Sequence, residues 1–292
     1  IVPVVGGGNP VNSISLRDLS RVLSGRLTNW RELGGPDAPV ILHMPDSGAG
    51  LAQGVQDRLL GPENLDLHED VERHASNAEV VRAVSRDPFG LGLASYSNLG
   101  NTRPLVLTGS CGFQLRAARR TIKTEDYPLT APMFLYLPAR RLPAIGREFL
   151  TFTRTQPAQI VIRRAGFVDQ APEEVPIDLQ GDRFANAILV AESDSGLETL
   201  QTMIRTLSDM RRLSTSFRFE TGSARLDAQS RSNVELLAEA LQRGVYRGRR
   251  LLFAGFSDGQ GPAETNRRLA LARAEAVRDA VAAAAAARGG LR

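Results

Sequence analysis

The residues of this 292-residue chain best suited to chemistry are an aspartate and an arginine near its C-terminal end. Asp258 follows an apolar run and precedes a predicted helix, where free amides and the helix dipole favour an anionic group. Arg273 comes seven residues after Asn266, about two helical turns along the same face, and a guanidinium can bind a carboxylate through two hydrogen bonds. Such a pair suits a ligand that carries both an ammonium and a carboxylate. The plainer interpretation is a turn-capping aspartate and an arginine in a surface salt bridge.

Motifs of enzyme active sites are missing from the sequence. Ser47 lies in Asp46-Ser47-Gly48-Ala49-Gly50, which is not the G-x-S-x-G turn of a serine nucleophile, and no glycine-rich nucleotide motif occurs. Cys111 is the single cysteine and has no metal-ligand spacing around it. Of the histidines, His43, His68 and His74, the last two are not four residues apart. We therefore expect no catalytic residue, no metal site and no cofactor.

Composition places the chain among globular proteins. Apolar residues make up 42% and charged residues 23%, and no apolar run approaches the ~18 residues of a membrane span. The net charge is +4, with 36 basic and 32 acidic residues spread over the whole length. No segment forms a basic arm, so we expect neither a nucleic-acid partner nor a membrane span.

The elements that must position Asp258 and Arg273 form a β-α-β-α series. Alternating residues predict a strand at 214–219, and Asp227 is expected to cap a helix whose buried face carries Val234, Leu237 and Leu241. A second strand at 250–256 leads through a glycine loop to a long helix from about 263, which ends in the alanine run 282–287.

The first half of the chain alternates short strands with helices, which predicts an α/β domain. Trp30 and Tyr127 are expected to pack in its core or hinge. The predicted strands are 1–5, 40–42, 90–94 and 133–137, and the predicted helices begin after Ser15 and Gly48 and cover 77–84, 145–153 and 157–165. A polar, proline-bearing linker follows at about 170, with a helix at 195–211.

The C-terminal pattern resembles the OmpA-like peptidoglycan-binding domain over about residues 213–281. In that family a strand ends in Gly-x-Thr-Asp and the next helix carries Asn-x-x-Leu-Ser-x-x-Arg-Ala. The matching positions here, with Ser257 for the threonine and Ala270 for the serine, are Gly255, Ser257, Asp258, Asn266, Leu269, Ala270, Arg273 and Ala274. The resemblance implies that Asp258, Arg273, Asn266 and Ser257 bind the diaminopimelate end of a peptidoglycan stem peptide.

The N-terminal half resembles the phosphate-type periplasmic substrate-binding proteins over about residues 1–170. The matching stretches are 1–5 with 9–11, 23–30 with 33–35, 46–48, 90–92 with Tyr96, 127–129 and 166–168. In that family a Ser-Gly-Thr at a helix start binds phosphate through amides and hydroxyls. The resemblance implies that Asp46, Ser47 and Gly48 contact a small oxyanion such as phosphate. The alternative is that these residues only cap the helix.

Two departures from the family pattern affect the choice of anion. Ala49 replaces the threonine, and His43-Met44-Pro45 stand where an arginine is expected. Loss of a hydrogen bond to a charged group lowers the binding free energy by roughly 1.5–3 kcal/mol, which is enough to change the preferred ligand. The family also has a βα portion before the strand at 1–5 and a last strand after the second C-terminal helix. We expect both in the complete protein. Cys111 would then pair with a cysteine in the missing portion, or remain a free buried thiol.

These resemblances predict a type II periplasmic-binding-protein-like α/β domain at 1–170, incomplete at its start. A linker at 171–212 and a βαβα OmpA-like α/β sandwich at 213–292, lacking its last strand, complete the chain. The leading hypothesis is a non-catalytic protein of the periplasm or cell envelope that binds peptidoglycan and a small anion. One alternative is the phosphate receptor of an ABC transporter, with an inner-membrane permease as partner. The other is a cell-wall-active enzyme.

Overall fold

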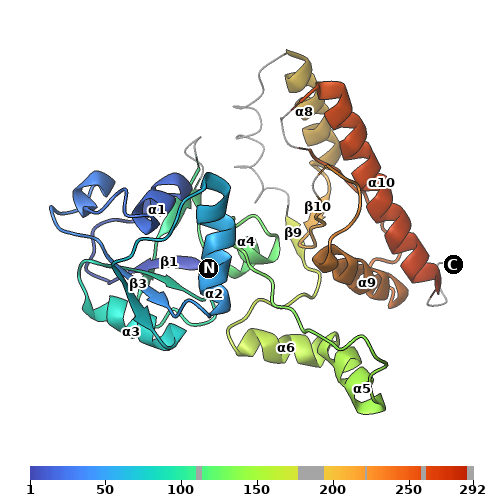
Figure 1. Ribbon diagram of the computed structural model, residues 1–292. Helices are drawn as coiled ribbons and strands as arrows, with labels where there is room; N and C mark the ends of the chain where they lie inside the picture. Colours follow the sequence, from blue (N-terminus) through green and yellow to red (C-terminus); the bar gives the residue numbers. More distant parts are fainter. Residues whose placement is uncertain (110–113, 177–193, 221, 258–260, 288–292) are drawn as a thin grey trace. The chain divides into compact units, whose positions relative to one another are not determined.

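A mixed five-stranded sheet forms the centre of the N-terminal part (Figure 1). The computed structural model describes residues 1–292 except 110–113, 177–193, 221, 258–260 and 288–292. The strand order is β4-β3-β5-β1-β6, in which β3 is parallel to both of its neighbours and β1 is antiparallel to both of its own. The strands are β1 (Val2–Val5), β3 (Ile41–Pro45), β4 (Val71–His74), β5 (Gly90–Ala94) and β6 (Arg103–Pro104).

Helix α3 (Asn77–Arg86) covers one face of this sheet (Figure 1). Its Val80 and Val84 are buried against valines of β1. Gly92 on β5 permits this close packing, because a Cβ at that position would lie 2.5 Å from Cγ2 of Val84. The α3 face is therefore lined by small and β-branched residues.

The opposite face of the sheet carries the larger core. Leucines of β5 and β3 pack there with helix α1 (Leu16–Leu23) and with the fully buried Trp30 and Tyr127. Ser15 caps α1 as predicted, because its hydroxyl accepts a hydrogen bond from the amide of Asp18 at 2.9 Å. The core position predicted for the two aromatic residues is confirmed.

A small second sheet and several short helices complete this part of the chain. Strand β2 is parallel to β7, and β8 is antiparallel to β7. Arg103 holds the segment between β1 and β2, because its guanidinium donates hydrogen bonds to the carbonyl oxygens of Asn9 and Val11. The remaining elements are β2 (Ser13–Ser15), β7 (Val106–Thr108), β8 (Gln114–Leu115), α2 (Gly50–Val55), α4 (Arg119–Lys123), the 3-10 helices Trp30–Leu33 and Gly61–Glu63, and the π-helix Gln56–Leu60.

The predicted strand at 133–137 is wrong. These residues form no strand, and the side chains from Met133 to Leu137 are between 50% and 93% exposed. An uninterrupted apolar run shows no period of two, so it does not by itself specify a strand, and in the described residues no neighbouring strand pairs with it. The two helices predicted after this run are present as α5 (Ala144–Thr153) and α6 (Gln156–Arg164).

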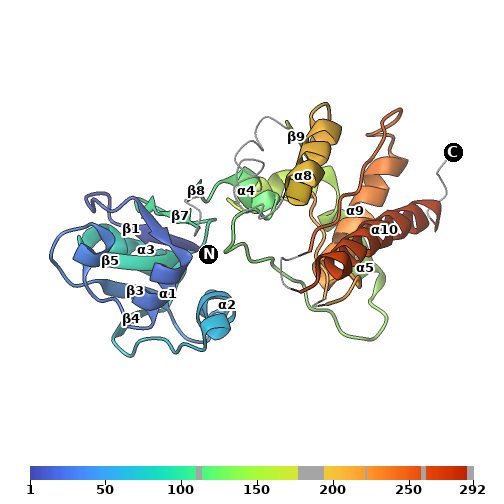
Figure 2. The ribbon, with the colours of Figure 1, turned by 90° about the horizontal axis from the view of Figure 1, so that it is seen from above.

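Two packed helices dominate the C-terminal part (Figure 2). Helix α9 (Ala228–Gln242) buries Val234 and Leu237 against Val277 and Val281 of α10 (Ala263–Ala287). Asp227 caps α9 as predicted, with its Oδ1 accepting from the amide of Ser230 at 2.7 Å. The preceding elements are helix α8 (Asp194–Leu207) and the antiparallel pair β9 (Glu174–Pro176) and β10 (Arg211–Leu213).

The two strands predicted at 214–219 and 250–256 are not formed as paired strands. In the described residues only an isolated bridge joins Phe219 to Leu226, and 251–257 has no assigned strand. Exposure nevertheless alternates along this segment: Leu251 and Phe253 are half-buried, whereas Leu252 and Phe256 are exposed. The segment 251–257 therefore turns alternate side chains inward like a strand, without a hydrogen-bonded ladder in the described residues.

The alanine run at the end of α10 is helical, as predicted, and packs on α9. Ala285 is fully buried, and its carbonyl oxygen accepts a hydrogen bond from Nε2 of Gln242 at 3.0 Å. Ala283 and Ala286 are exposed on the other side of the same helix.

The contacts divide the described chain into two compact units. One holds the described residues of Ile1–Phe134, Val161–Val168 and Ile177–Asp209, and the other holds the rest. The predicted domain boundaries near 170 and 212 remain predictions. None of the helices in the described ranges is both long and apolar enough to cross a bilayer.

Candidate ligand-binding sites

Gly255 allows the segment 251–257 to lie directly on helix α10. A Cβ at Gly255 would be 1.9 Å from the carbonyl oxygen of Ala270 and 3.2 Å from the amide nitrogen of Ala274. Only a residue without a side chain permits this approach. The segment therefore crosses α10 at the turn that carries Arg273, and its end is brought to that side chain.

Arg273 is held by three groups from two other segments. Its Nε donates to the carbonyl oxygen of Ser223 at 3.0 Å, and its Nη1 donates to that of Phe256 at 3.1 Å. The guanidinium carbon lies 5.1 Å from the centroid of the Phe219 ring, a favourable cation–π arrangement. Its partners in the described chain are thus carbonyls and a ring rather than the carboxylate of a surface salt bridge. These hydrogen bonds use two of the five N–H groups of the guanidinium.

The Ser223 carbonyl belongs to a tight turn between Phe219 and Leu226. The amide of Ser223 donates to the carbonyl of Glu220 at 3.0 Å, and the amide of Glu220 donates to that of Arg225 at 3.0 Å. Gly222 has a φ of 65°, a left-handed conformation that favours glycine. The turn presents its carbonyl to Arg273 in a defined position.

The other residues predicted to contact peptidoglycan are Ser257, Asn266 and Asp258. Ser257 directly follows Phe256, whose carbonyl binds Arg273, and is half-buried. Asn266 is half-buried in the first turn of α10, and its amide donates to the carbonyl of Pro262 at 3.1 Å. Asp258 lies outside the described residues. The structure thus brings together Arg273 and the residue that precedes Ser257.

The predicted anion-binding residues form an exposed loop between β3 and α2. Asp46, Ser47 and Gly48 are all exposed, and the amide of Ala49 closes a turn by donating to the Asp46 carbonyl at 2.9 Å. Helix α2 begins at Gly50, and its N-cap is Ala49, which makes no side-chain cap hydrogen bond. The interpretation of Asp46, Ser47 and Gly48 as the N-cap of this helix is therefore wrong.

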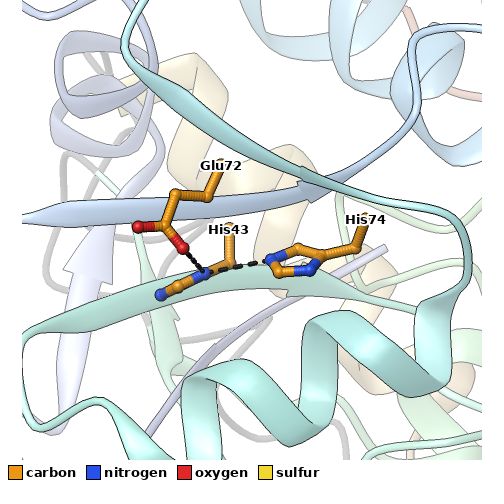
Figure 3. A group of neighbouring side chains, drawn as sticks. All are labelled: His43, Glu72 and His74. Carbon is orange, nitrogen blue, oxygen red and sulfur yellow. Dashed lines mark hydrogen bonds and ion pairs between the residues drawn. The ribbon is translucent and has the colours of Figure 1, made fainter.

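A group of titratable residues was missed by the sequence analysis. His43 on β3 lies beside Glu72 and His74 on β4, and these three side chains meet on the α3 face of the sheet (Figure 3). His43 is 3% exposed, so its imidazole is a buried polar group. Thirty-one residues separate the two histidines, and only the pairing of β3 with β4 brings them together. A prediction of that pairing would have found the group.

Comparison with known proteins finds similarities for both parts of the chain. The model of the OmpA family matches residues 218–287, which include Ser257, Asn266 and Arg273. The matched region contains α9, α10 and the turn that holds the guanidinium. This region is therefore an OmpA-family domain.

The N-terminal part is similar to phosphate-binding proteins. The phosphate-binding protein PstS of Borreliella burgdorferi is 23% identical over 166 residues, which are 54% of this chain and 58% of that protein. PstS of Bacillus subtilis is 25% identical, with 62% of this chain and 59% of that protein covered. Protein SphX of Synechococcus elongatus is 27% identical, with coverages of 56% and 52%. The chain thus spans a little over half the length of these curated relatives.

A solved structure supports the fold of this part. It is that of a proposed phosphate ABC transporter substrate-binding protein with bound phosphate, from Clostridium perfringens. It superposes with a TM-score of 0.52 and 19% identity, covering 57% of this chain and 67% of that one. The chain joins a substrate-binding-protein-like α/β part to an OmpA-family domain. Both expected resemblances are confirmed.

Proposed function

We propose that this chain is a non-catalytic protein of the cell envelope that binds peptidoglycan through its C-terminal domain. The observation that carries the proposal is the placement of Arg273. Its guanidinium is fixed by two carbonyls and the Phe219 ring, and N–H groups remain for a carboxylate ligand. Asp258 follows Ser257 and supplies the acceptor for an ammonium group. Together they fit the amino and carboxyl groups of diaminopimelate in a stem peptide, with Ser257 and Asn266 as further contacts.

The wall-binding proposal is tested by co-sedimentation of the full chain with purified sacculi. The wild-type chain is expected to pellet, and Arg273→Ala and Asp258→Ala are expected to remain largely in the supernatant. Losing a hydrogen-bonded charge contact costs about 2–5 kcal/mol, which corresponds to an affinity loss of at least roughly 30-fold. Arg278→Ala is the matched control, because Arg278 lies on the same helix, is exposed and pairs with Asp279.

The control separates a specific site from general charge attraction. If Arg278→Ala lowers pelleting as much as Arg273→Ala does, binding depends on net charge alone and the assigned site is wrong. Unchanged pelleting of both Arg273→Ala and Asp258→Ala removes the proposal. Arg273→Lys, which keeps the charge but not the planar fork, is expected to bind weakly.

We also propose that the N-terminal part binds a small oxyanion, phosphate first among them, at the loop Asp46, Ser47 and Gly48. The similarity to phosphate-binding proteins and the exposure of this loop support it. The Ser47 hydroxyl and the amides of Ser47 and Gly48 donate to anion oxygens, and the Asp46 carboxylate accepts from a protonated phosphate oxygen. Calorimetry with phosphate is expected to show binding that Ser47→Ala weakens and that the exposed control Ser85→Ala leaves intact. A chain that gives no heat with phosphate contradicts the proposal.

A transport receptor is the second candidate function, favoured by the relatives named as phosphate-binding proteins. In that role the chain delivers its anion to an ABC permease of the inner membrane. The C-terminal domain, bound to peptidoglycan, retains the chain in the periplasm. The receptor role requires stimulation of permease ATPase activity by the loaded chain in reconstituted membranes. If the chain with bound anion does not stimulate the permease ATPase but still pellets with sacculi, the result favours the peptidoglycan-binding function over the receptor role.

A further inference from the structure

The parallel pairing of β3 and β4 places three potential ligands on one side of the sheet. His43 is registered opposite Glu72, and Pro45 opposite His74. Because alternate residues of a strand point to the same face, His43, Glu72 and His74 all project toward the α3 side. Their ligand atoms lie within 4.8 Å of one another (Figure 3).

Asp87 determines which nitrogen of His43 faces this group. Asp87 is the C-cap of α3, and its Oδ1 accepts a hydrogen bond from the amide of Phe89 at 2.9 Å. Its Oδ2 lies 3.0 Å from Nε2 of His43, where an ionised carboxylate can only accept a hydrogen bond from a protonated Nε2. In the neutral imidazole this leaves an unprotonated Nδ1. Carboxylates commonly orient metal-binding histidines in this way.

The Nδ1 atom of His43 faces two partners at once. It lies 3.1 Å from Nε2 of His74 and 3.2 Å from a carboxylate oxygen of Glu72. One ring nitrogen forms a single good hydrogen bond, and an unprotonated nitrogen is not stabilised by a neighbouring carboxylate oxygen. A cation between the three groups satisfies all of them. Metal–ligand distances of about 2.0–2.1 Å give ligand–ligand separations of roughly 2.9–3.4 Å, which match the two observed here.

The site combines a fixed inner ligand with an accessible outer one. The side chain of His43 is 4% exposed, whereas that of Glu72 is 60% exposed, so an ion can enter from solvent. Gly90 leaves the space that the His43 ring occupies, since a Cβ there would lie 3.1 Å from the ring. Two imidazoles and one carboxylate suit a borderline first-row divalent ion and leave coordination positions open.

We propose that His43, Glu72 and His74 bind a divalent transition-metal ion, zinc first among them, with Asp87 as the positioning residue. The ion joins the edge strand β4 to β3 and neutralises the Glu72 carboxylate. The group adjoins the proposed anion loop, because the amide of Asp46 donates to the carbonyl oxygen of His74 at 3.0 Å. Its side chains are not among those assigned to either proposed ligand site, so the inference does not depend on the proposed function.

Calorimetry with zinc chloride tests the site on the untagged, chelator-treated full chain. One equivalent of zinc is expected to bind, and the thermal unfolding midpoint is expected to rise with zinc concentration. His74→Ala and Glu72→Gln change half-buried and exposed residues, and each is expected to weaken zinc binding at least about tenfold. His68→Ala is the matched control, since His68 is the half-buried histidine outside the group.

Asp87→Asn tests the tautomer directly without a change of shape. Its carbonyl oxygen can keep the Phe89 amide, and its NH₂ group then donates to Nε2 of His43 and moves the ring proton to Nδ1. Zinc affinity is expected to fall about 10- to 100-fold while the metal-free chain unfolds at a similar temperature. Absence of zinc binding by the wild-type chain overturns the proposal. Wild-type affinity in His74→Ala and Glu72→Gln also overturns it.

Discussion

At the scale of single residues, position was predictable from the sequence but partners were not. The spacing from Asn266 to Arg273 placed the arginine on the correct face of a helix, whereas its contacts with Ser223 and Phe219 depend on a turn far back in the chain. The histidine group is the clearer case. His43 and His74 carry no local motif, and only the register of two parallel strands brings them together.

Tyr127 provides a residue-scale prediction about stability. Its side chain is fully buried, burial raises its pKa, and its hydroxyl has no hydrogen-bond partner in the described chain. An unpaired buried hydroxyl costs free energy, so Tyr127→Phe is expected to leave the free energy of unfolding unchanged or to raise it by up to about 1 kcal/mol. Urea denaturation of the two chains measures this. A loss of stability above that size would show that the hydroxyl is hydrogen-bonded.

At the scale of elements, helix positions were predicted better than strands. Ser15 and Asp227 begin helices as expected, because a capping oxygen followed by apolar residues at helical spacing is a local signal. The strand expected at 133–137 and the ladders expected at 214–219 and 250–256 did not form. Strands need a partner, and the identity of that partner is not contained in the segment itself.

At the scale of elements, we predict that a side chain at Gly255 destabilises the packing of segment 251–257 on α10. Gly255→Ala places a methyl group against the backbone of Ala270, which cannot rotate away, so the segment 251–257 must shift. We expect a stability loss of at least about 2 kcal/mol and weaker pelleting with sacculi, because the Phe256 carbonyl moves from Arg273. Gly7→Ala is the control, since nothing lies within 4 Å of a Cβ there. Wild-type stability of Gly255→Ala would show that the segment does not rest on α10.

At the scale of the whole molecule, the two proposed binding sites belong to different compact units. Ser47 and Arg273 lie in separate units, and neither is a core residue whose loss would unfold the chain. Ser47→Ala is therefore expected to weaken phosphate binding without changing pelleting with sacculi, and Arg273→Ala is expected to do the reverse. Calorimetry and co-sedimentation on both variants measure this. A variant that loses both activities would point to unfolding or to coupling between the units.

The alanine run of α10 shows how unequal identical residues can be. Ala285 is enclosed by α9, whereas Ala283 and Ala286 face solvent on the same helix. A larger side chain is accommodated at the exposed positions and is excluded at Ala285, where the helix backbone itself accepts a hydrogen bond from Gln242. Tolerance to substitution in this run therefore follows the phase of the helix rather than the chemistry of the residue. Six neighbouring positions with the same amino acid differ in what they permit, and the difference comes entirely from the neighbouring helix.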